Sequence, residues 1–456
     1  MNKENILHVE ICQHANSTLS KETIENIVQA KLKSMEEISL DIVLRGEDLV
    51  KNTIKDEMEI ENHSIEDNFK SDEIIKHHVE SVACSSDHLE KGTVKVEGLI
   101  FKYYIYRLVY EDGATETMHS DSDELPVMSH WMLPAKEFHY MWENLYYDCN
   151  IKNNLLRFVE TTMLFSDLTV NSNIISWNKV VLLHGPPGTG KTSMCKALAQ
   201  KATIRLEKRF QYGEFIEINS HSLFSKWFSE SGKLVMKLFD EIKTMVQDEK
   251  TLVCILIDEI ESLAHARKLC SNGTEPSDSI RVVNALLTQL DQIKRYPNVL
   301  ILTTSNMTQA IDLAFVDRAD IKQYLGYPSE SAIYSIYHSC LRELMRVGIL
   351  EDEKIYDISD LKRQKLFGYT EDSENSVKLL QLSRESEGLS GRILRKIPFL
   401  AHALYLSAEK FTMVEFLEAM HSAISKQNQQ DVELREEKVS EVQFCTDSAS
   451  SSRNRH

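Results

Sequence analysis

A glycine-rich loop near the middle of the chain has the residues that bind a nucleotide phosphate. It follows the pattern Gly-x-x-x-x-Gly-Lys-Thr and consists of Gly185, Pro186, Pro187, Gly188, Thr189, Gly190, Lys191 and Thr192. Glycines at these positions let backbone N–H groups approach the β-phosphate closely. Lys191 would place its charge on the β- and γ-phosphates, and Thr192 would offer its hydroxyl to Mg²⁺. The loop therefore predicts a site for ATP and Mg²⁺.

An apolar stretch and a helical pattern flank this loop. Residues 180–184 have the composition of a buried strand, and apolar residues recur at helical spacing over 194–198. In this setting the phosphate also meets a helix N-terminus, which favours anion binding. A glycine-rich turn that only joins a strand to a helix is the alternative, and the strand–loop–helix order favours the phosphate site.

Acidic and amide residues follow two further apolar strands. Asp258 and Glu259 come directly after the run 252–257, and Asn306 follows the run 299–304. A carboxylate such as Asp258 reaches Mg²⁺ directly or through water, and Glu259 would polarise the attacking water. Asn306 would orient that water and read the γ-phosphate, although an asparagine that only turns the chain is the alternative.

Lys191, the Asp258-Glu259 pair and Asn306 are thus expected at the ends of three successive strands. Active groups collect at that edge of an open α/β sheet. Together these motifs predict an α/β P-loop ATPase of the AAA+ class, with a parallel doubly wound sheet, a C-terminal helical lid and a small N-terminal α+β domain. The chain has one such loop, so any ring would have a single tier of these ATPase modules.

Two arginines are candidates for completing the site. AAA+ ATPases usually place an arginine that acts on the neighbouring subunit's nucleotide within a segment that corresponds to 312–320, where Arg318 stands between two aspartates. Most relatives have Arg-x-x-Arg there, so a structural Arg–Asp pair is the alternative. Arg392, in the run 388–392, matches the second sensor, an arginine that reaches the phosphates from the lid. Ser390 can cap its helix, and an arginine on a helix surface is the alternative.

Two large aromatic residues lie in a polar stretch between the nucleotide motifs. In ring-forming AAA+ unfoldases the position of Trp227 and Phe228 is the first pore loop, whose aromatics grip an extended polypeptide by apolar contact. Aromatics packed on the domain's own core are the alternative. Residues 272–278 are a candidate second pore loop, and a plain surface loop explains them nearly as well.

The hydrophobic pattern divides the chain into three folded regions, a linker and a tail. Residues 1–115 lack a catalytic motif, so we expect an α+β domain that recognises a substrate or adaptor. The acidic residues 116–132 predict a linker. Residues 133–327 alternate apolar strands with amphipathic helices, as in the large AAA+ domain. A helical lid is expected over 328–426, and a polar, disordered tail over 427–456.

Local patterns predict elements within the outer regions. The β-branched and aromatic runs 7–11 and 94–106 indicate strands. Apolar residues at helical spacing after Ser20 indicate a helix that ends near Ser34, with Ser20 as its N-cap. A longer helical pattern covers 331–347 in the lid.

Composition narrows the class of protein. The chain of 456 residues has no apolar run near the ~20 residues that a membrane helix needs, and no signal-peptide pattern. Its eight cysteines are scattered, as in proteins with reduced cytosolic or nuclear thiols. The net charge of −18 and the lack of a Lys/Arg-rich run argue against direct nucleic-acid binding, although a local basic groove stays open.

With these motifs in place, the chain resembles the pachytene checkpoint protein 2 family, known in animals as thyroid hormone receptor interactor 13. The likeness is dense from 133 to 405 and looser over 1–115. The runs that carry it are 182–200, 217–233, 273–278, 317–324 and 387–392. The Asp-Arg-Ala-Asp segment around Arg318 is normal for this family, which favours Arg318 as the arginine that acts in trans.

The resemblance implies a homohexameric ring that remodels HORMA-domain proteins from a closed, partner-bound state to an open one. It would engage a terminal segment of the substrate in its pore, with a HORMA-like adaptor that delivers the substrate to the N-terminal domain. The implied roles are disassembly of the mitotic spindle checkpoint complex and removal of meiotic HORMA proteins from chromosome axes. We therefore expect the protein in the nucleus and cytoplasm, with association to chromosomes or kinetochores, and with no membrane partner.

Two other functions remain as alternatives. A nucleic-acid-acting AAA+ ATPase, such as a clamp-loader or helicase relative, predicts a basic pore lining. The candidate loops instead carry Trp227, Phe228 and Glu275, with only Lys226 and Lys233 nearby. A nucleotide-binding scaffold without turnover is the third option, and the presence of every hydrolytic group argues against it.

Overall fold

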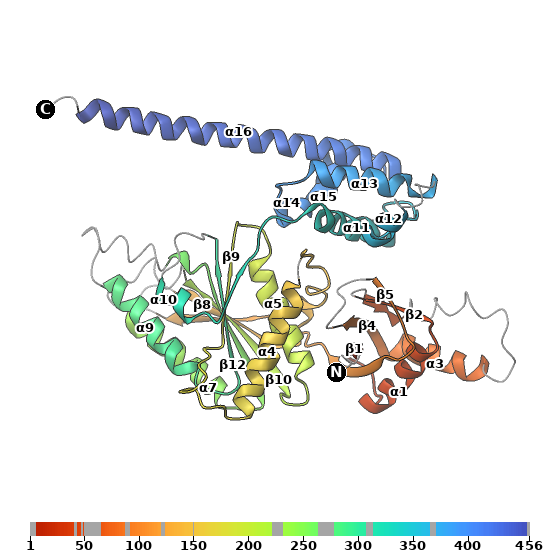
Figure 1. The fold of residues 1–456 in the computed structure, drawn as a ribbon, viewed down its shortest axis with the longest axis horizontal. Helices are drawn as coiled ribbons and strands as arrows, with labels where there is room; N and C mark the ends of the chain where they lie inside the picture. The colour runs from red at the N-terminus through yellow and green to blue at the C-terminus, as the bar shows by residue number, and fades with distance from the viewer. Residues whose placement is uncertain are drawn as a thin grey trace. The chain divides into compact units, whose positions relative to one another are not determined.

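The computed structural model divides the chain into two compact units (Figure 1). The first unit is Met1–Leu145 with Cys149–Leu325, and the second is Tyr146–Asp148 with Gly326–His456. The residues that the structure describes are 6–40, 43–46, 49, 65–86, 92–119, 124–148, 150–220, 231–262, 278–306, 313–364 and 371–453.

The N-terminal part of the first unit is a small α+β domain. Its four-stranded sheet has the order β3-β4-β1-β6, with β1 antiparallel to β4 and parallel to β6, and β2 pairs with β5 in a second sheet. The strands are β1 (Ile6–Gln13), β2 (Glu37–Leu40), β3 (Val43–Arg45), β4 (Val79–Ser86), β5 (Gly92–Lys95) and β6 (Ile100–Arg107). The predicted strand at 7–11 is confirmed. The predicted strand at 94–106 is two strands, because the chain turns at Gly98, where φ is +79°.

Helices α1 (Lys21–Lys33) and α3 (Ile65–His78) pack with this sheet. The Ser20 hydroxyl accepts a hydrogen bond from the backbone N–H of Thr23, so Ser20 is the N-cap that the sequence predicts. One face of α1 enters the core of the domain with Ile24, Val28 and Leu32, which lie one helical turn apart.

The second part of the first unit is a seven-stranded sheet with the order β13-β9-β12-β11-β10-β8-β7 (Figure 1). The five strands from β13 to β10 are parallel. The strands are β7 (Ala114–His119), β8 (Glu124–Leu133), β9 (Val180–His184), β10 (Tyr212–Asn219), β11 (Thr251–Asp258), β12 (Val299–Ser305) and β13 (Ile321–Tyr324). The three predicted strands that precede the candidate site residues are therefore confirmed, as is the doubly wound α/β class.

Helices cover both faces of this sheet. Helices α7 and α9 pack together against one face, in a core that includes Val235 and Phe239 from α7 and Leu286 from α9. Helices α4 and α5 lie on the other face (Figure 1). The bounds are η2 (Lys136–Phe138), α4 (Ile151–Asp167), α5 (Lys191–Arg205), α7 (Ser231–Val246), α9 (Asp278–Ile293) and α10 (Leu313–Arg318).

The predicted linker at 116–132 is wrong for the residues that the structure describes. Strands β7 and β8 run through this segment, and β8 pairs antiparallel with β10 at the edge of the sheet. Met128 enters the main core, and the Trp131 ring lies 5.5 Å from that of Phe138 and 5.9 Å from that of Phe215, centroid to centroid. The acidic residues of this segment suggested a linker. The apolar contacts of Met128 and Trp131 instead pack the segment against the sheet as a strand.

The second unit is helical. Its helices are α11 (Glu330–Arg346), α12 (Ile358–Gln364), η3 (Glu371–Ser373), α13 (Glu374–Glu385), α14 (Gly391–Leu394), α15 (Ile397–Tyr405) and α16 (Met413–Arg453). The helix predicted at 331–347 is α11, and the Ser329 hydroxyl caps it. Tyr337 is fully buried, and its hydroxyl lies 2.8 Å from that of Ser386. A search of the described residues finds no helix with the length and apolarity that a membrane-spanning helix requires.

A short segment from before the large sheet's nucleotide loop also belongs to this helical unit. Tyr146 packs against the lid core, and the Asp148 carboxylate accepts hydrogen bonds from the Ser329 hydroxyl and, at 3.3 Å, from the Ser329 backbone N–H. Because Ser329 caps α11, Asp148 fixes the start of that helix. The chain therefore changes unit three times: after Leu145, after Asp148 and after Leu325.

The disordered tail predicted from residue 427 is wrong for the described residues. Helix α16 continues to Arg453 (Figure 1). Residues 414–453 contain neither proline nor glycine, and side-chain hydrogen bonds of 3.0 Å join Gln427 to Asp431 and Gln429 to Glu433 at the i, i+4 spacing of a helix. Polar composition suggested disorder, but the segment has no residue that stops a helix.

A buried ion cluster joins the N-terminal domain to helix α5. Glu10 of β1 bonds Arg205 Nε at 2.5 Å with one carboxylate oxygen and Lys201 Nζ at 2.6 Å with the other. All three side chains are at most 7% exposed. Lys201 also bonds Glu143 at 3.0 Å, and Arg205 donates to Ser85 Oγ of β4 at 2.8 Å. Burial alone would raise the pKa of Glu10, but the two cations hold it below its usual value.

Replacing Glu10 with glutamine should destabilise the first unit by about 3–5 kcal/mol, because Lys201 and Arg205 then stay buried without their counter-charge. The midpoint of urea unfolding measures this loss. Lys21→Ala is the control, since its ion pair with Glu207 at 2.8 Å is exposed and should contribute below about 1 kcal/mol. The fold lowers the pKa of Glu10 from its ordinary value of 4.5. The difference in the free energy of unfolding between the wild type and Glu10→Gln should therefore be full above pH 4.5 and shrink as the pH falls below it. Equal losses in both variants would contradict the expectation.

Candidate nucleotide site

The phosphate loop lies between β9 and α5, as the sequence predicts. Gly190 is the N-cap of α5 with φ +89°, in the left-handed region that glycine adopts readily. Gly185 has φ +144°, and a Cβ atom there would lie 2.1 Å from the carbonyl oxygen of Leu325. The first glycine of the motif is therefore required by the close approach of the chain after β13, and the last by the turn into the helix.

Lys191 lies in the first turn of α5 and is almost fully buried. Its ammonium donates hydrogen bonds to the carbonyl oxygens of Gly185 at 3.0 Å and Pro186 at 2.8 Å. The Thr189 hydroxyl also donates to Pro186, at 2.9 Å. The charge is thus held inside the curve of the loop, where the helix N-terminus also favours an anion. This arrangement suits the phosphate-binding role that the sequence predicts for Lys191.

Thr192 and Asp258 lie together, although 66 positions separate them in the chain. The Thr192 hydroxyl donates to the Asp258 carboxylate at 3.0 and 3.2 Å. Hydroxyl and carboxylate oxygens are ligands that Mg²⁺ prefers. The pair brings the two predicted metal ligands to one place beside the loop, so these residues fit a Mg²⁺ ion that arrives with ATP.

Glu259 and Asn306 also come together at this edge of the sheet. Asn306 Nδ2 donates to Glu259 Oε1 at 3.2 Å, and the Asn306 backbone N–H donates to Glu261 Oε1 at 3.1 Å. The amide of Asn306 therefore fixes the direction of the Glu259 carboxylate. The geometry suits the predicted pair of a water-activating carboxylate and a polar sensor.

Three titratable side chains in β9, α5 and β11 are neutral: His184, Cys195 and Cys254. Burial and the charge of Lys191 lower the pKa of His184, so its imidazole is neutral at pH 7. Burial raises the pKa of Cys195 well above its usual value and that of Cys254 to about 12. Among the described residues, Cys12, Cys84, Cys195, Cys254 and Cys340 are free thiols. The thiols of Cys195 and Cys254 therefore stay protonated and carry no charge.

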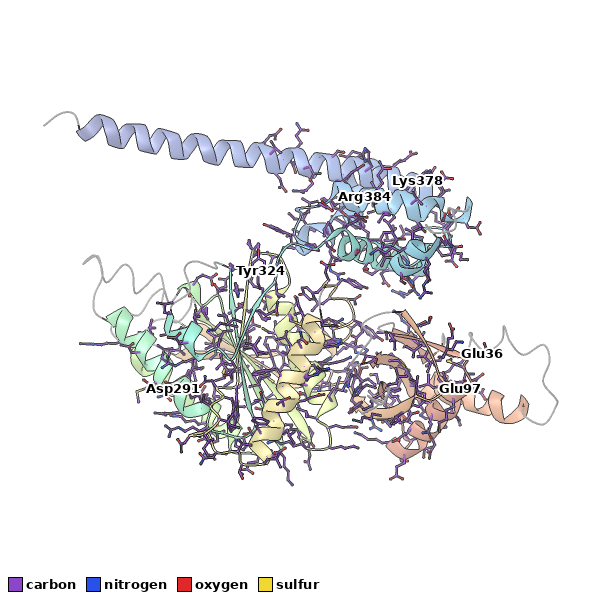
Figure 2. The ribbon with its side chains drawn as sticks, viewed as in Figure 1. Glu36, Glu97, Asp291, Tyr324, Lys378 and Arg384 are labelled. Atoms are coloured by element: carbon purple, nitrogen blue, oxygen red, sulfur yellow. The ribbon has the colours of Figure 1, made fainter. Side chains whose placement is uncertain are left out.

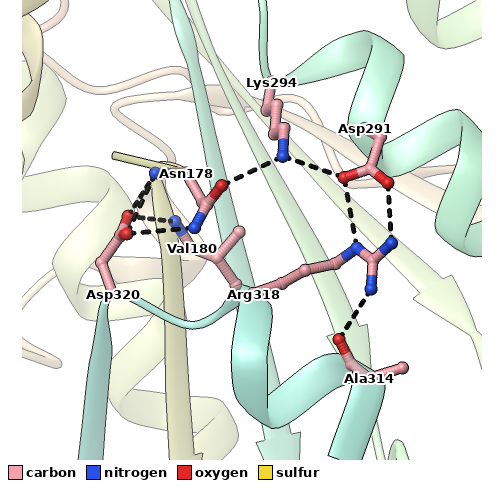
Figure 3. Close-up of polar contacts among 7 residues, drawn as sticks. All are labelled: Asn178, Val180, Asp291, Lys294, Ala314, Arg318 and Asp320. Carbon is pink, nitrogen blue, oxygen red and sulfur yellow. Dashed lines mark hydrogen bonds and ion pairs between the residues drawn. The ribbon is translucent and has the colours of Figure 1, made fainter. Parts of the chain in front are cut away.

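Arg318, the candidate trans-acting arginine, is bonded within its own chain (Figure 3). It ends α10, and its guanidinium meets the Asp291 carboxylate near the end of α9 with Nε at 3.2 Å and Nη2 at 2.7 Å (Figure 3). Figure 2 labels Asp291 in a view of the whole chain. Lys294 bonds the same carboxylate at 2.9 Å. The hydrogen bond from Arg318, ahead of the charge of Lys294, lowers the pKa of Asp291. The alternative of an Arg–Asp pair is thus formed here, with Asp291 as the partner.

Asp320, two residues after Arg318, has a different role. Its carboxylate accepts from the backbone N–H of Asn178 at 2.8 and 3.0 Å and from that of Val180 at 3.3 Å (Figure 3). It therefore fixes the start of β9, the strand that leads into the phosphate loop.

The remaining predicted site residues are on the second unit or outside the described chain. Arg392 lies in the first turn of α14, where the Ser390 hydroxyl accepts from the backbone N–H of Ile393, so the predicted cap is confirmed. Trp227, Phe228 and residues 272–277 lie outside the described residues. Their roles, and that of Arg392 toward the phosphates, stay predictions.

Sequence reasoning missed three residues that contact the predicted ones. Asp291 bonds Arg318, Thr304 bonds Asp258 and Glu259, and Ser220 bonds the Asp258 backbone. In the sequence, Thr304 is the last residue of the apolar run 299–304. A threonine near the end of a fully buried strand is a signal that could have marked it, because a buried hydroxyl requires a partner.

The fold and site define a P-loop ATPase of the AAA class. The family model for the ATPase family associated with various cellular activities matches residues 181–327, and a TRIP13-like, AAA+ ATPase lid C-terminal domain matches 329–428. The chain belongs to the pachytene checkpoint protein 2 family. The resemblance found in the sequence is thereby confirmed, together with the AAA+ fold and the assignment as an ATPase.

Similar proteins extend over nearly the whole chain. The pachytene checkpoint protein 2 homolog of Mus musculus is 48% identical over 426 residues, which are 92% of this chain and 93% of the relative. That of Homo sapiens is 57% identical over 326 residues, 71% of this chain and 75% of the relative. The solved structure of C. elegans PCH-2 has a TM-score of 0.71 and 32% identity, and the match covers 93% of this chain and all of that one.

Proposed function

We propose that this ATPase acts as a homohexameric ring that converts HORMA-domain proteins from a closed to an open state. The observation that carries the proposal is the 48% identity to a pachytene checkpoint protein 2 homolog over 92% of the chain. This similarity includes the N-terminal domain and the lid as well as the nucleotide site. The resemblance implies a family whose members remodel HORMA proteins, and the proposal assigns recognition of the substrate or adaptor to the N-terminal domain.

The proposed cellular roles follow from the same family. They are disassembly of the spindle checkpoint complex and control of meiotic chromosome axes and recombination, with a HORMA-like adaptor that delivers the substrate to the N-terminal domain. The protein would work in the nucleus and cytoplasm, with association to chromosomes or kinetochores. No direct contact with nucleic acid is needed for this activity, in keeping with the net charge of −18.

Each predicted site residue has a separate role in the proposed ATP hydrolysis. Lys191 and the loop would bind the phosphates, while Thr192 and Asp258 would hold Mg²⁺, which neutralises charge on the phosphate oxygens. Glu259, aimed by Asn306 at 3.2 Å, would take the proton of the attacking water. Arg318 would act in the neighbouring subunit's site, and Arg392 would link the phosphates to the lid. Trp227 and Phe228 would grip the substrate chain in the pore.

Addition of a closed HORMA-domain protein plus its adaptor should raise the steady-state ATPase rate and yield the open form, which native ion-exchange chromatography separates. Double-stranded and single-stranded DNA serve as the comparison, because a clamp-loader or helicase relative would respond to them. Stimulation by DNA, with no response to the HORMA protein and adaptor, would overturn the proposal in favour of the nucleic-acid-acting alternative.

A further inference from the structure

Glu259 has a backbone conformation that its residue type disfavours. It follows β11 directly and has φ +56°, in the left-handed region. A residue with a Cβ atom stays there only when its neighbours hold it. The direction in which the Glu259 carboxylate leaves the sheet depends on this turn, so the groups that hold the backbone also set the position of the side chain.

Thr304 holds the backbone at Glu259 by bonding its N–H group. It lies on the neighbouring strand β12, and its Oγ1 accepts from the backbone N–H of Glu259 at 3.1 Å. The same hydroxyl donates to the Asp258 carboxylate. Its backbone carbonyl accepts from the N–H of Ile260 at 3.0 Å. A threonine hydroxyl has one proton and two lone pairs, so it satisfies both side-chain roles at once.

Two serines hold the same turn from the carbonyl side. The Ser220 hydroxyl, directly after β10, donates to the carbonyl oxygen of Asp258 at 2.6 Å. The Ser262 hydroxyl donates to that of Glu259 at 2.9 Å. The peptide units on both sides of Glu259 are therefore fixed by hydroxyl groups of Thr304, Ser220 and Ser262. Of these three, Thr304 also bonds the carboxylate of Asp258, the group predicted to hold the metal.

We propose that Thr304 is a positioning residue for ATP hydrolysis. Its hydroxyl fixes the Asp258-Glu259 turn, so that Asp258 stays beside Thr192 while Glu259 points toward Asn306. Thr304 acts through these two carboxylates and does not itself touch the reacting phosphate. The inference rests on the ATPase activity and on the roles assigned to Asp258 and Glu259, and it is independent of the substrate protein.

Thr304→Val keeps the shape of the side chain and removes both hydroxyl contacts. A displacement of about 1 Å in a catalytic group costs about 100-fold in rate, so we expect kcat for ATP to fall about 10- to 100-fold. The KM for ATP and the dissociation constant for ADP should change far less, because Lys191 and the loop keep their contacts. Thr304→Ser retains the hydroxyl and should restore most of kcat.

Thr303→Val is the matched control. Thr303 precedes Thr304 on the same strand and is equally buried, and its hydroxyl donates to the Val181 carbonyl at 3.0 Å, away from the carboxylates. Both valine variants lose one buried hydroxyl, so both should lower the unfolding temperature to a similar extent. Only Thr304→Val should lower kcat selectively.

Three results would overturn the proposal. They are an unchanged kcat in Thr304→Val, an equal fall of kcat in Thr303→Val, and a Thr304→Ser variant as slow as the valine one. If Thr304→Val does not fold, Thr304→Ala carries the test, since it removes the same two hydroxyl contacts with a smaller side chain. A folded Thr304→Ala with the kcat and KM of the wild type would then contradict the inference.

Discussion

Replacement of Glu259 by glutamine should lower kcat for ATP hydrolysis by about 10²–10⁴-fold, the usual contribution of a general base. The glutamine oxygen can still accept the hydrogen bond that Asn306 donates to Glu259 at 3.2 Å. The amide cannot take a proton from water, so binding should persist while hydrolysis stops. Steady-state turnover and the fraction of ATP retained after rapid desalting measure the two effects.

Glu261→Gln is the matched control for this experiment. Glu261 also carries a carboxylate at the same edge of the sheet, where it accepts from the Asn306 backbone N–H at 3.1 Å. Its change should cost much less than that of Glu259, because Glu261 bonds a backbone N–H and has no assigned part in hydrolysis. Unchanged turnover in Glu259→Gln, or an equal loss in Glu261→Gln, would show that the general base has been assigned to the wrong residue. Size measurement of Glu259→Gln with and without ATP also tests whether trapped nucleotide stabilises the proposed hexamer.

Replacement of Arg318 by alanine should lower turnover by about 10³–10⁵-fold if this arginine acts on the neighbouring subunit's phosphates. Such an arginine works in trans, so a mixture should regain activity that neither variant has alone. Rings that contain both Arg318→Ala and Glu259→Gln subunits would hold some sites with an intact Glu259 and an arginine from the neighbour. We expect turnover to rise when the two inactive proteins are mixed and allowed to exchange subunits.

The bond between Arg318 and Asp291 supplies the control. In the trans role the arginine has to leave this carboxylate, so Asp291→Asn, which weakens the pair, should retain most of the turnover. In a purely structural role the pair itself matters. Asp291→Asn would then lower turnover and the unfolding temperature as much as Arg318→Ala, and mixing would rescue nothing. These two sets of results separate the alternatives that the sequence left open.

The parts of the site that the sequence predicted share one property. Lys191 follows β9 through the phosphate loop, Asp258 ends β11, and Asn306 comes directly after β12. The edge where these parallel strands end is fixed by the topology of the sheet. Short-range patterns thus placed residues that are far apart in the chain. The same reasoning succeeded for Ser20 and Ser390, because an N-cap is a contact within one turn of helix.

The parts that the sequence did not reveal depend on contacts that no local pattern records. Residues 116–132 are acidic, but β8 forms because β10, much later in the chain, offers it an edge. The role of Thr304 depends on the positive φ of Glu259, and the pairing of Arg318 depends on where α9 ends. Each of these is a tertiary fact, so composition and spacing could not supply it.

Helix α5 starts at the phosphate loop and ends in the ion cluster of the N-terminal domain. Lys191 lies in its first turn, while Lys201 and Arg205 near its end hold Glu10. Glu207, just past the helix, accepts the backbone N–H of Ile105 at 3.3 Å. The N-terminal domain is therefore packed on the far end of the helix that begins at the phosphate loop, so a division of the chain near residue 115 would break these contacts. If N-terminal domains are exchanged between relatives, the end of α5 should be exchanged with them. Otherwise the chimera will bury charged side chains at the positions of Glu10, Lys201 and Arg205 without their partners.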